Sequence, residues 1–266
     1  MDPGLLAWSV LTAWALLSAA VAWCRSAGFR DGDIWAGAAI RVARLYSRLF
    51  HRLRIEGREH VPVRPSDGVG ERPLIVIANH TAGVDPVLIQ AALPFEIRWM
   101  MAEDMRLPAL QWLWDFGRII FVDRGRGGSA GLREALRHLK TNATLGIFPE
   151  GGIERPPRRI MPFREGIGVM IERTDALVLP LIIDGTPQVD PAWASLWRPS
   201  RARVRFLPVI DFAAQGAQAQ AIAAELRELY LRQTGWPAND QPADPDAPDR
   251  GSVRNGPDAA PPRDGT

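Results

Sequence analysis

The 266-residue sequence has little cysteine and little histidine, and both shortages restrict its chemistry. Cys24 is the single cysteine, which excludes an intrachain disulfide and a metal cluster held by cysteines. It lies in an apolar stretch, so we expect no thiol nucleophile. The four histidines form no HxH or HExxH pattern. We therefore expect neither a bound metal nor a cofactor.

A serine nucleophile is also not expected, although residues 127–131 match the G-x-S-x-G pattern of serine hydrolases. A nucleophile elbow turns tightly from strand to helix, whereas here residues 123–128 intervene before Ser129. Only His138 follows that serine, so the usual order of serine, acid and histidine fails. We interpret Ser129 as the N-cap of a helix over residues 130–140.

Large apolar residues are nearly absent from residues 236–266, which are rich in proline and aspartate. Such a segment buries too little surface to offset its ordering entropy, so we expect a disordered tail. The tail holds six Asp and three Arg, and the basic excess therefore lies in the rest of the chain. No strand combines arginine with interleaved aromatic residues, so we expect no nucleic-acid partner.

One long apolar run is present, from Leu5 to Cys24, without a charged residue. At about 1.5 Å per residue it spans the ~30 Å of a bilayer core, which predicts a transmembrane helix. A cleaved signal peptide is the alternative, because residues 20–22 form an A-x-A site, but the leader MDPG has no basic residue. Arg25 and Arg30 follow the run and predict a single-pass anchor with the bulk of the chain in the cytoplasm.

Residues 34–55 show an apolar stripe at helical spacing, flanked by arginines. We predict one amphipathic helix over this segment and assign residues 1–55 to a membrane anchor. Two interpretations remain open. The helix lies at the membrane interface, or it packs on the catalytic domain with a solvated basic face.

From residue 56 to residue 235, short apolar runs alternate with helical patterns, as expected of a single catalytic domain. This alternation predicts an α/β fold with a mostly parallel sheet and helices on both faces. We expect strands at 73–78, 96–101, 118–122, 144–148, 178–184 and 202–209, and helices at 85–93, 105–116, 130–140, 164–173 and 214–232.

The segment NHTAGVDP places His80 and Asp85 just after the first of these strands. The end of a strand in an α/β sheet is the usual position of catalytic groups. A histidine whose other ring nitrogen contacts a carboxylate is fixed in one tautomer and can accept a proton from a hydroxyl. We therefore predict that His80 is a general base oriented by Asp85.

Four further segments follow in a fixed order: GRIIFVDR at 117–124, FPEGG at 148–152, MPFREG at 161–166 and VLPLI at 178–182. With NHTAGVD, this order resembles the glycerolipid acyltransferase family, typified by 1-acylglycerol-3-phosphate acyltransferases. The resemblance covers roughly residues 56–212. It implies a glycerol-3-phosphate acyltransferase-like fold.

The resemblance also implies a reaction, the transfer of a fatty acyl group from acyl-CoA or acyl carrier protein to a lysophospholipid hydroxyl. The implied product is phosphatidate, made from 1-acylglycerol 3-phosphate in phospholipid biosynthesis. Without a serine or cysteine nucleophile, the hydroxyl attacks the thioester directly, and membrane lipids are partners. The implied site comprises the base His80 with Asp85, and substrate-binding positions at Asn79, Arg124, Glu150, Gly151 and Gly152.

One departure concerns the acceptor. Many family members read F-P-E-G-T-R-S, whereas Gly152 and Ile153 here precede Glu154. Arg155, Arg158 and Arg159 are close in sequence and can supply the missing charge. The alternatives are a lysophospholipid with another head group, such as lysophosphatidylethanolamine, and an inactive membrane adaptor, which the presence of His80 and Asp85 disfavours.

Overall fold

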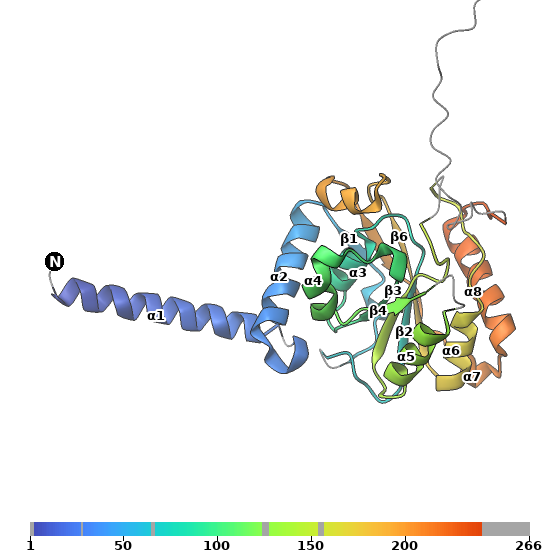
Figure 1. Cartoon of the computed structure of the whole chain (residues 1–266), viewed down its shortest axis with the longest axis horizontal. Coiled ribbons are helices and arrows are strands. Elements are labelled where there is room, and N and C mark those ends of the chain that lie inside the picture. The colour runs from blue at the N-terminus through green and yellow to red at the C-terminus, as the bar shows by residue number, and fades with distance from the viewer. Residues whose placement is uncertain (1–2, 28, 65–66, 124–127, 154–156, 241–266) are drawn as a thin grey trace, which may run out of the picture.

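The computed structural model describes residues 3–27, 29–64, 67–123, 128–153 and 157–240. Seven strands form one sheet in the order β1-β7-β6-β2-β5-β3-β4 (Figure 1). The strands are β1 (Arg54–Glu56), β2 (Leu74–Ala78), β3 (Arg98–Ala102), β4 (Ile120–Val122), β5 (Thr144–Ile147), β6 (Leu177–Asp184) and β7 (Arg203–Phe206). The pairing of β6 with β7 is antiparallel and the other pairings are parallel. The predicted α/β fold with a mostly parallel sheet is confirmed.

Eight α-helices accompany the sheet within the described residues. They are α1 (Pro3–Arg25), α2 (Ile34–Leu49), α3 (Asp85–Ala92), α4 (Gln111–Phe116), α5 (Ser129–Leu139), α6 (Gly166–Thr174), α7 (Phe212–Gln215) and α8 (Ala219–Thr234). Five short 3-10 helices join them, η1 (Phe29–Gly32), η2 (Arg58–His60), η3 (Glu103–Met105), η4 (Pro108–Leu110) and η5 (Ala192–Trp197).

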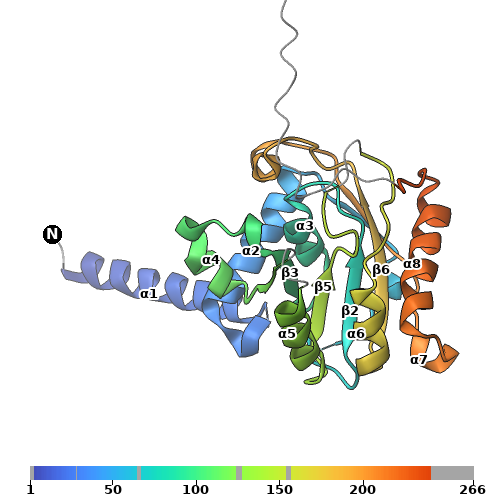
Figure 2. The same cartoon turned by 45° about the vertical axis from the view of Figure 1, so that its right-hand side comes forward.

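Successive side chains of β2 point to opposite faces of the sheet, and all of them are apolar, so both faces are covered. Ile75 and Ile77 pack into one apolar cluster with residues of α5, α6 and α8. Leu74, Val76 and Ala78 point to the opposite face and pack with residues of α3. Successive side chains of a strand point to opposite faces, so a strand that is apolar throughout requires a layer on each side. Figure 2 shows these two layers.

The predicted helix over residues 34–55 is wrong at its C-terminal end. Helix α2 ends at Leu49, Arg52 has a positive φ of 46°, and residues 54–56 form strand β1 beside β7. The Arg54 N–H donates to the carbonyl of Ala202, 3.0 Å away. An open sheet edge offers backbone partners that the spacing of apolar residues along the chain does not reveal.

Helix α2 packs on the domain and also has an exposed apolar face. Its buried side includes Ala36, Gly37 and Ile40, and it lies against α3 and α1. Gly37 permits the closest approach, because an added Cβ would lie 2.0 Å from the carbonyl oxygen of Cys24. The predicted stripe faces outward instead, as shown by the exposed side chains of Val42, Leu45 and Leu49.

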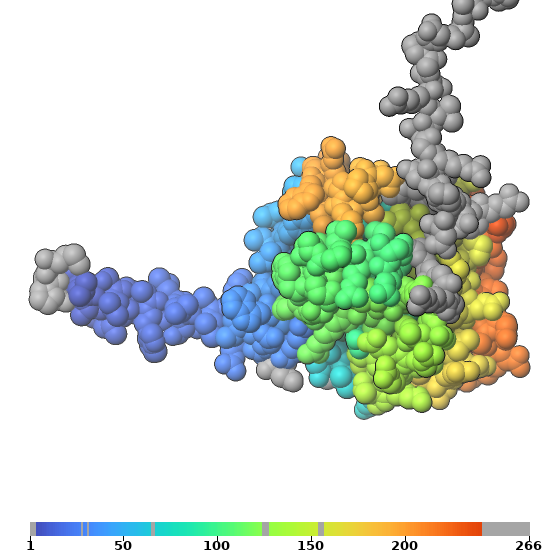
Figure 3. Space-filling view, in the orientation of Figure 1, coloured from blue at the N-terminus to red at the C-terminus, as the bar shows by residue number. Residues whose placement is uncertain are grey.

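Helix α1 extends away from the rest of the molecule (Figures 1 and 3). The most apolar 18-residue window within residues 4–25 has a mean hydropathy of 1.9, and no residue of that window is buried by other elements. Its length and composition are sufficient to cross a membrane.

Two further expectations need correction. The tail was expected to be disordered from residue 236, but residues 236–240 are ordered: Ile160 bridges to Ala238, and Arg227 contacts the Asp240 carboxylate at 2.5 Å. Residues 241–266 lie outside the described residues. Ser129 is the first residue of α5 rather than its N-cap. That position belongs to Gly128, whose φ of 62° suits glycine.

Candidate active site

The candidate site lies in the loop that joins the carboxyl end of β2 to the start of α3. Strand β2 is central in the sheet, between β6 and β5. Asn79 opens the loop and is buried, and its side-chain amide donates to the Ile183 carbonyl and accepts from the Ile183 N–H, both at 2.9 Å. Asn79 therefore extends the pairing of β2 with β6. A contact with substrate remains a prediction.

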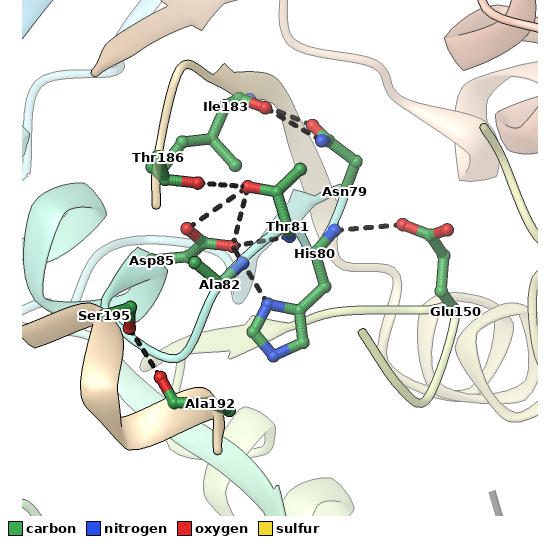
Figure 4. Close-up of polar contacts among 10 residues, drawn as sticks. All are labelled: Asn79, His80, Thr81, Ala82, Asp85, Glu150, Ile183, Thr186, Ala192 and Ser195. Atoms are coloured by element: carbon green, nitrogen blue, oxygen red, sulfur yellow. Dashed lines mark hydrogen bonds and ion pairs between the residues drawn. The ribbon is translucent and has the colours of Figure 1, made fainter. Parts of the chain in front are cut away.

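His80 and Asp85 are brought together as the sequence predicts. The Nδ1 atom of His80 lies 3.0 Å from Oδ2 of Asp85 (Figure 4). The Asp85 side chain is fully buried, whereas that of His80 is 16% exposed. Its Nε2 makes no hydrogen bond with any residue that the structure describes. The histidine thus presents one ring nitrogen for chemistry.

Backbone N–H groups hold the Asp85 carboxylate as a hydrogen-bond acceptor. Its Oδ2 atom accepts the N–H of Thr81 at 2.7 Å and the N–H of Ala82 at 2.8 Å. A carboxylate that accepts two amides acts as an acceptor toward the imidazole as well, so Nδ1 carries the proton. The Nε2 lone pair is then free to accept one. Asp85 is also the first residue of α3, where the helix dipole favours a negative charge.

Two threonines complete the support of this carboxylate. The hydroxyl of Thr81 lies 3.2 Å from Oδ2 of Asp85 and 2.6 Å from the hydroxyl of Thr186, which follows β6. Both threonines are buried. Thr186 was not among the predicted site residues. Its position just after an apolar strand is the signal that could have indicated it.

Glu150 lies beside the loop and holds its backbone. Its Oε1 accepts the N–H of His80 at 2.9 Å, and its Oε2 accepts the N–H of Met161 at 3.1 Å. The side chain is only 5% exposed. The predicted site segments 79–85, 148–152 and 161–166 are therefore adjacent in space. The acceptor-binding role of Glu150 remains a prediction.

The glycines after Glu150 differ in their surroundings. Gly151 has a φ of 72°, and an added Cβ would lie 2.9 Å from Nε of Arg164. An added Cβ at Gly152 would meet no heavy atom within 4 Å. Among the nearby arginines, Arg158 pairs with Asp184 at 3.1 Å. Arg124 and Arg155 lie outside the described residues.

A further segment covers the loop from the side of β6. An added Cβ at Gly83 would lie 2.6 Å from the carbonyl oxygen of Ala192, at the start of η5. Glycine is therefore required at this close approach. The Trp193 ring lies 5.5 Å from the ring of Trp114 in α4. Within the described residues, no group of three His, Cys, Asp or Glu side chains could hold a metal ion.

Comparison with known proteins identifies the class. A family model described as "Acyltransferase" matches residues 52–184, half of the chain and the part that contains His80, Asp85 and Glu150. The chain belongs to the acyltransferase family, and its resemblance to the glycerolipid acyltransferases is confirmed.

Individual relatives are more distant. A protein described as "Taffazin" from Dictyostelium discoideum is 30% identical over 129 residues, which cover 42% of this chain and 44% of that protein. The 1-acyl-sn-glycerol-3-phosphate acyltransferase of Helicobacter pylori is 25% identical over 112 residues, which cover 41% of this chain and 47% of that protein. The chain spans less than half the length of these curated relatives.

A solved structure has the same fold. The crystal structure of the 1-acyl-sn-glycerophosphate (LPA) acyltransferase PlsC from Thermotoga maritima superposes with a TM-score of 0.57 at 23% identity. The superposition covers 76% of this chain and 80% of that one. This similarity shows that the two proteins share a fold.

Proposed function

We propose that the protein transfers a fatty acyl group from a thioester to the hydroxyl of a lysophospholipid. The hydrogen bond between His80 and Asp85, at the end of the central strand and inside the acyltransferase segment, carries the proposal. The buried carboxylate fixes the imidazole tautomer, and the partly exposed ring faces the side from which substrates approach.

The reaction follows from the open Nε2 of His80. This nitrogen takes the proton of the acceptor hydroxyl while the hydroxyl oxygen attacks the thioester carbonyl carbon. The tetrahedral intermediate then collapses, the carbon–sulfur bond breaks, and the imidazolium returns the proton to the departing thiolate. Asp85 stabilises the positive charge that His80 carries between these two steps. No acyl-enzyme forms, and the donor is acyl-CoA or acyl carrier protein.

For the acceptor we propose 1-acylglycerol 3-phosphate, which gives phosphatidate. The Helicobacter pylori relative, a 1-acyl-sn-glycerol-3-phosphate acyltransferase, supports this choice. We place the acceptor phosphate near Arg124, because RGRGG before α5 offers guanidinium groups and backbone N–H groups to a dianion. Glu150, Gly151 and Gly152 would line the acceptor side of the site, and Asn79 its base.

A different head group is the second candidate. The sequence Gly152-Ile153 stands where many family members have Thr-Arg, and Arg158 is paired with Asp184. With one arginine missing and another engaged, the site holds less free positive charge for a phosphate dianion. A zwitterionic lysophospholipid such as lysophosphatidylethanolamine needs less of that charge. One relative, described as "Taffazin", does not carry the name of a lysophosphatidate acyltransferase, which fits a different acceptor.

We further propose that α1 anchors the protein in a membrane with the catalytic domain on the cytoplasmic side, where acyl thioesters are found. Exposed apolar side chains continue from α1 onto α2 and α4, as at Leu45, Trp112 and Leu113. Tryptophan is enriched at membrane interfaces. The three helices lie on the same side of the molecule in Figures 1 and 2, so this side would face the bilayer.

A donor and acceptor screen tests the proposal. Purified full-length protein in detergent is given acyl-CoA or acyl carrier protein together with lysophosphatidate or lysophosphatidylethanolamine, and products are read by lipid mass spectrometry. We expect diacyl product, and less than about a hundredth of the parental amount from His80→Ala. Product formation without a lysophospholipid, or equal turnover by His80→Ala, would contradict the proposal.

A further inference from the structure

The structure shows a second restraint on His80, made by an aromatic ring rather than a polar group. The Phe148 ring lies parallel to the His80 imidazole, with centroids 3.9 Å apart and an angle of 13° between the planes. Phe148 also stacks on Trp99, with ring centroids 5.1 Å apart and again an angle of 13° between the planes. The three rings therefore form one stack that includes the imidazole. Trp99 lies in β3, Phe148 follows β5 and His80 follows β2.

Strand geometry places these rings on one face of the sheet. Phe148 follows β5 and lies two residues after Gly146, so their Cβ positions share a face. Gly146 is the parallel partner of Trp99. One residue before Phe148, Ile147 pairs with Ile77, and His80 comes three residues after Ile77. The stack thus crosses β3, β5 and the end of β2.

Gly146 creates the space for the stack. An added Cβ at this position would lie 2.6 Å from the Cε3 atom of Trp99 and 2.6 Å from Cγ2 of Ile97. Any larger residue at 146 would displace the Trp99 indole from its contact with Phe148. Trp99 is 6% exposed, and its Nε1 has no hydrogen-bond partner among the described residues. The indole is therefore held by packing alone.

The imidazole turns about two side-chain bonds, Cα–Cβ and Cβ–Cγ, and a single hydrogen bond restrains only one combination of these two rotations. The Asp85 contact fixes one end of the ring at 3.0 Å. It does not fix the plane of the ring. The Phe148 face fixes that plane, and the direction in which Nε2 points depends on it. A stacked pair of aromatic rings contributes stability beyond that of the apolar area it buries.

We propose that Phe148 is a positioning residue for acyl transfer, which sets the plane of the His80 ring and so the direction of the Nε2 lone pair, with Trp99 as its support. This inference rests on the proposed function of His80 as the general base. It predicts an effect on the chemical step rather than on substrate binding, because Phe148 acts through the imidazole.

Phe148→Leu tests the role, with Phe148→Tyr as the aromatic counterpart. We expect the leucine variant to lose about tenfold in kcat with KM for both substrates unchanged, and the tyrosine variant to stay within about twofold of the parent. Phe148→Met gives a second non-aromatic side chain if the leucine variant fails to fold. Phe121→Leu is the matched control, since Phe121 is also partly buried but stacks on Arg106 instead.

A spectroscopic signature separates the stack from the proposed function. The ring current of Phe148 should move the His80 ring-proton resonance upfield in NMR spectra, and His80→Gln identifies that resonance by its loss. We expect the resonance to move downfield in Phe148→Leu and to stay in place in Phe148→Tyr, whether or not the protein turns over a lysophospholipid.

Three outcomes would overturn the inference. The first is a folded Phe148→Leu or Phe148→Met variant with parental kcat and an unmoved His80 resonance. The second is an equal loss of kcat in Phe148→Tyr. The third is a loss confined to KM. An inactive parent that nevertheless shows the resonance shift would instead contradict the proposed function and leave the stack established.

Discussion

His80 and Asp85 would carry the proposed reaction, so their side chains provide its sharpest test at the scale of single residues. His80→Ala should lower kcat on the order of 100-fold to 10,000-fold, because the acceptor hydroxyl loses its base. Asp85→Asn should cost a large part of that, since an amide does not stabilise the imidazolium. His60→Ala, at a partly exposed histidine outside the site, serves as the control.

Steady-state turnover and thermal unfolding of the same samples check this expectation. Both variants should unfold near the temperature of the parent. A folded His80→Ala variant that retains more than about a tenth of parental turnover would show that another group takes the proton.

In the proposed acceptor site, Gly152 and Ile153 would determine how much positive charge faces the head group. Gly152→Thr with Ile153→Arg should raise kcat/KM for lysophosphatidate relative to lysophosphatidylethanolamine by several-fold, because an added guanidinium favours a dianion. The space around Gly152 accommodates a side chain, since no heavy atom lies within 4 Å of an added Cβ.

A matched uncharged variant, Gly152→Thr with Ile153→Gln, separates charge from size. The ratio of kcat/KM for the two acceptors is the measurement. If the arginine variant folds and the ratio stays the same or reverses, the segment does not touch the head group.

At the scale of elements, the exposed face of α2 predicts a membrane contact independent of α1. A protein without residues 1–21 keeps Cys24 against Gly37 and should still bind anionic vesicles in part. Apolar burial of Val42, Leu45 and Leu49 would contribute, together with roughly 1 kcal/mol for each basic residue near the surface. High salt should weaken this binding.

Cosedimentation with vesicles measures the bound fraction. Replacing Val42, Leu45 and Leu49 by serine in the shortened protein should abolish binding. Val63→Ser is the control, because Val63 is an exposed apolar residue that lies outside α2. A shortened protein that stays wholly soluble at low salt would make α1 the sole anchor.

At the scale of the whole molecule, a buried histidine ties α2 to the segment that covers the site. His51 is 0% exposed, and its ring nitrogens lie 2.7 Å from the hydroxyls of Ser200 and Tyr46. The Tyr46 hydroxyl donates to the Leu196 carbonyl at 2.6 Å. A neutral imidazole satisfies both contacts, and burial lowers the pKa of His51 below its ordinary 6.5.

This pKa makes the stability of the fold depend on pH. Because the pKa of His51 is lower in the folded chain, the unfolded chain binds more proton there as the pH falls through about 6.5, so stability falls as the pH decreases. Burial also lowers the pKa of His138, which adds to the effect with the same sign. His51→Gln should therefore reduce the loss of Tm between pH 7.5 and pH 5.5.

Calorimetry of the parent and of His51→Gln at both pH values checks this, with His60→Gln as the control. The slope with pH is the informative quantity, because removing the buried contacts lowers Tm at every pH. An unchanged slope in His51→Gln would show that His51 does not couple protonation to folding.

Local sequence patterns determined most of the elements and the composition of the site. The apolar run 74–78, with turn residues after it, predicted β2 and placed His80 and Asp85 at its end, because a strand buried on both faces must be apolar throughout. The family motifs predicted an acyltransferase reaction. The length of the apolar N-terminal run predicted a membrane-spanning helix without reference to any other part of the chain.

Only the tertiary structure decided which groups from distant segments meet. Three contacts each join segments far apart in sequence: residues 54–56 pair with β7, Phe148 stacks with His80 and Trp99, and the His80 N–H donates to Glu150. Such contacts depend on strand order and register, which arise when the whole sheet packs. A periodic pattern records which face of an element is buried, but it does not record what that face is buried against.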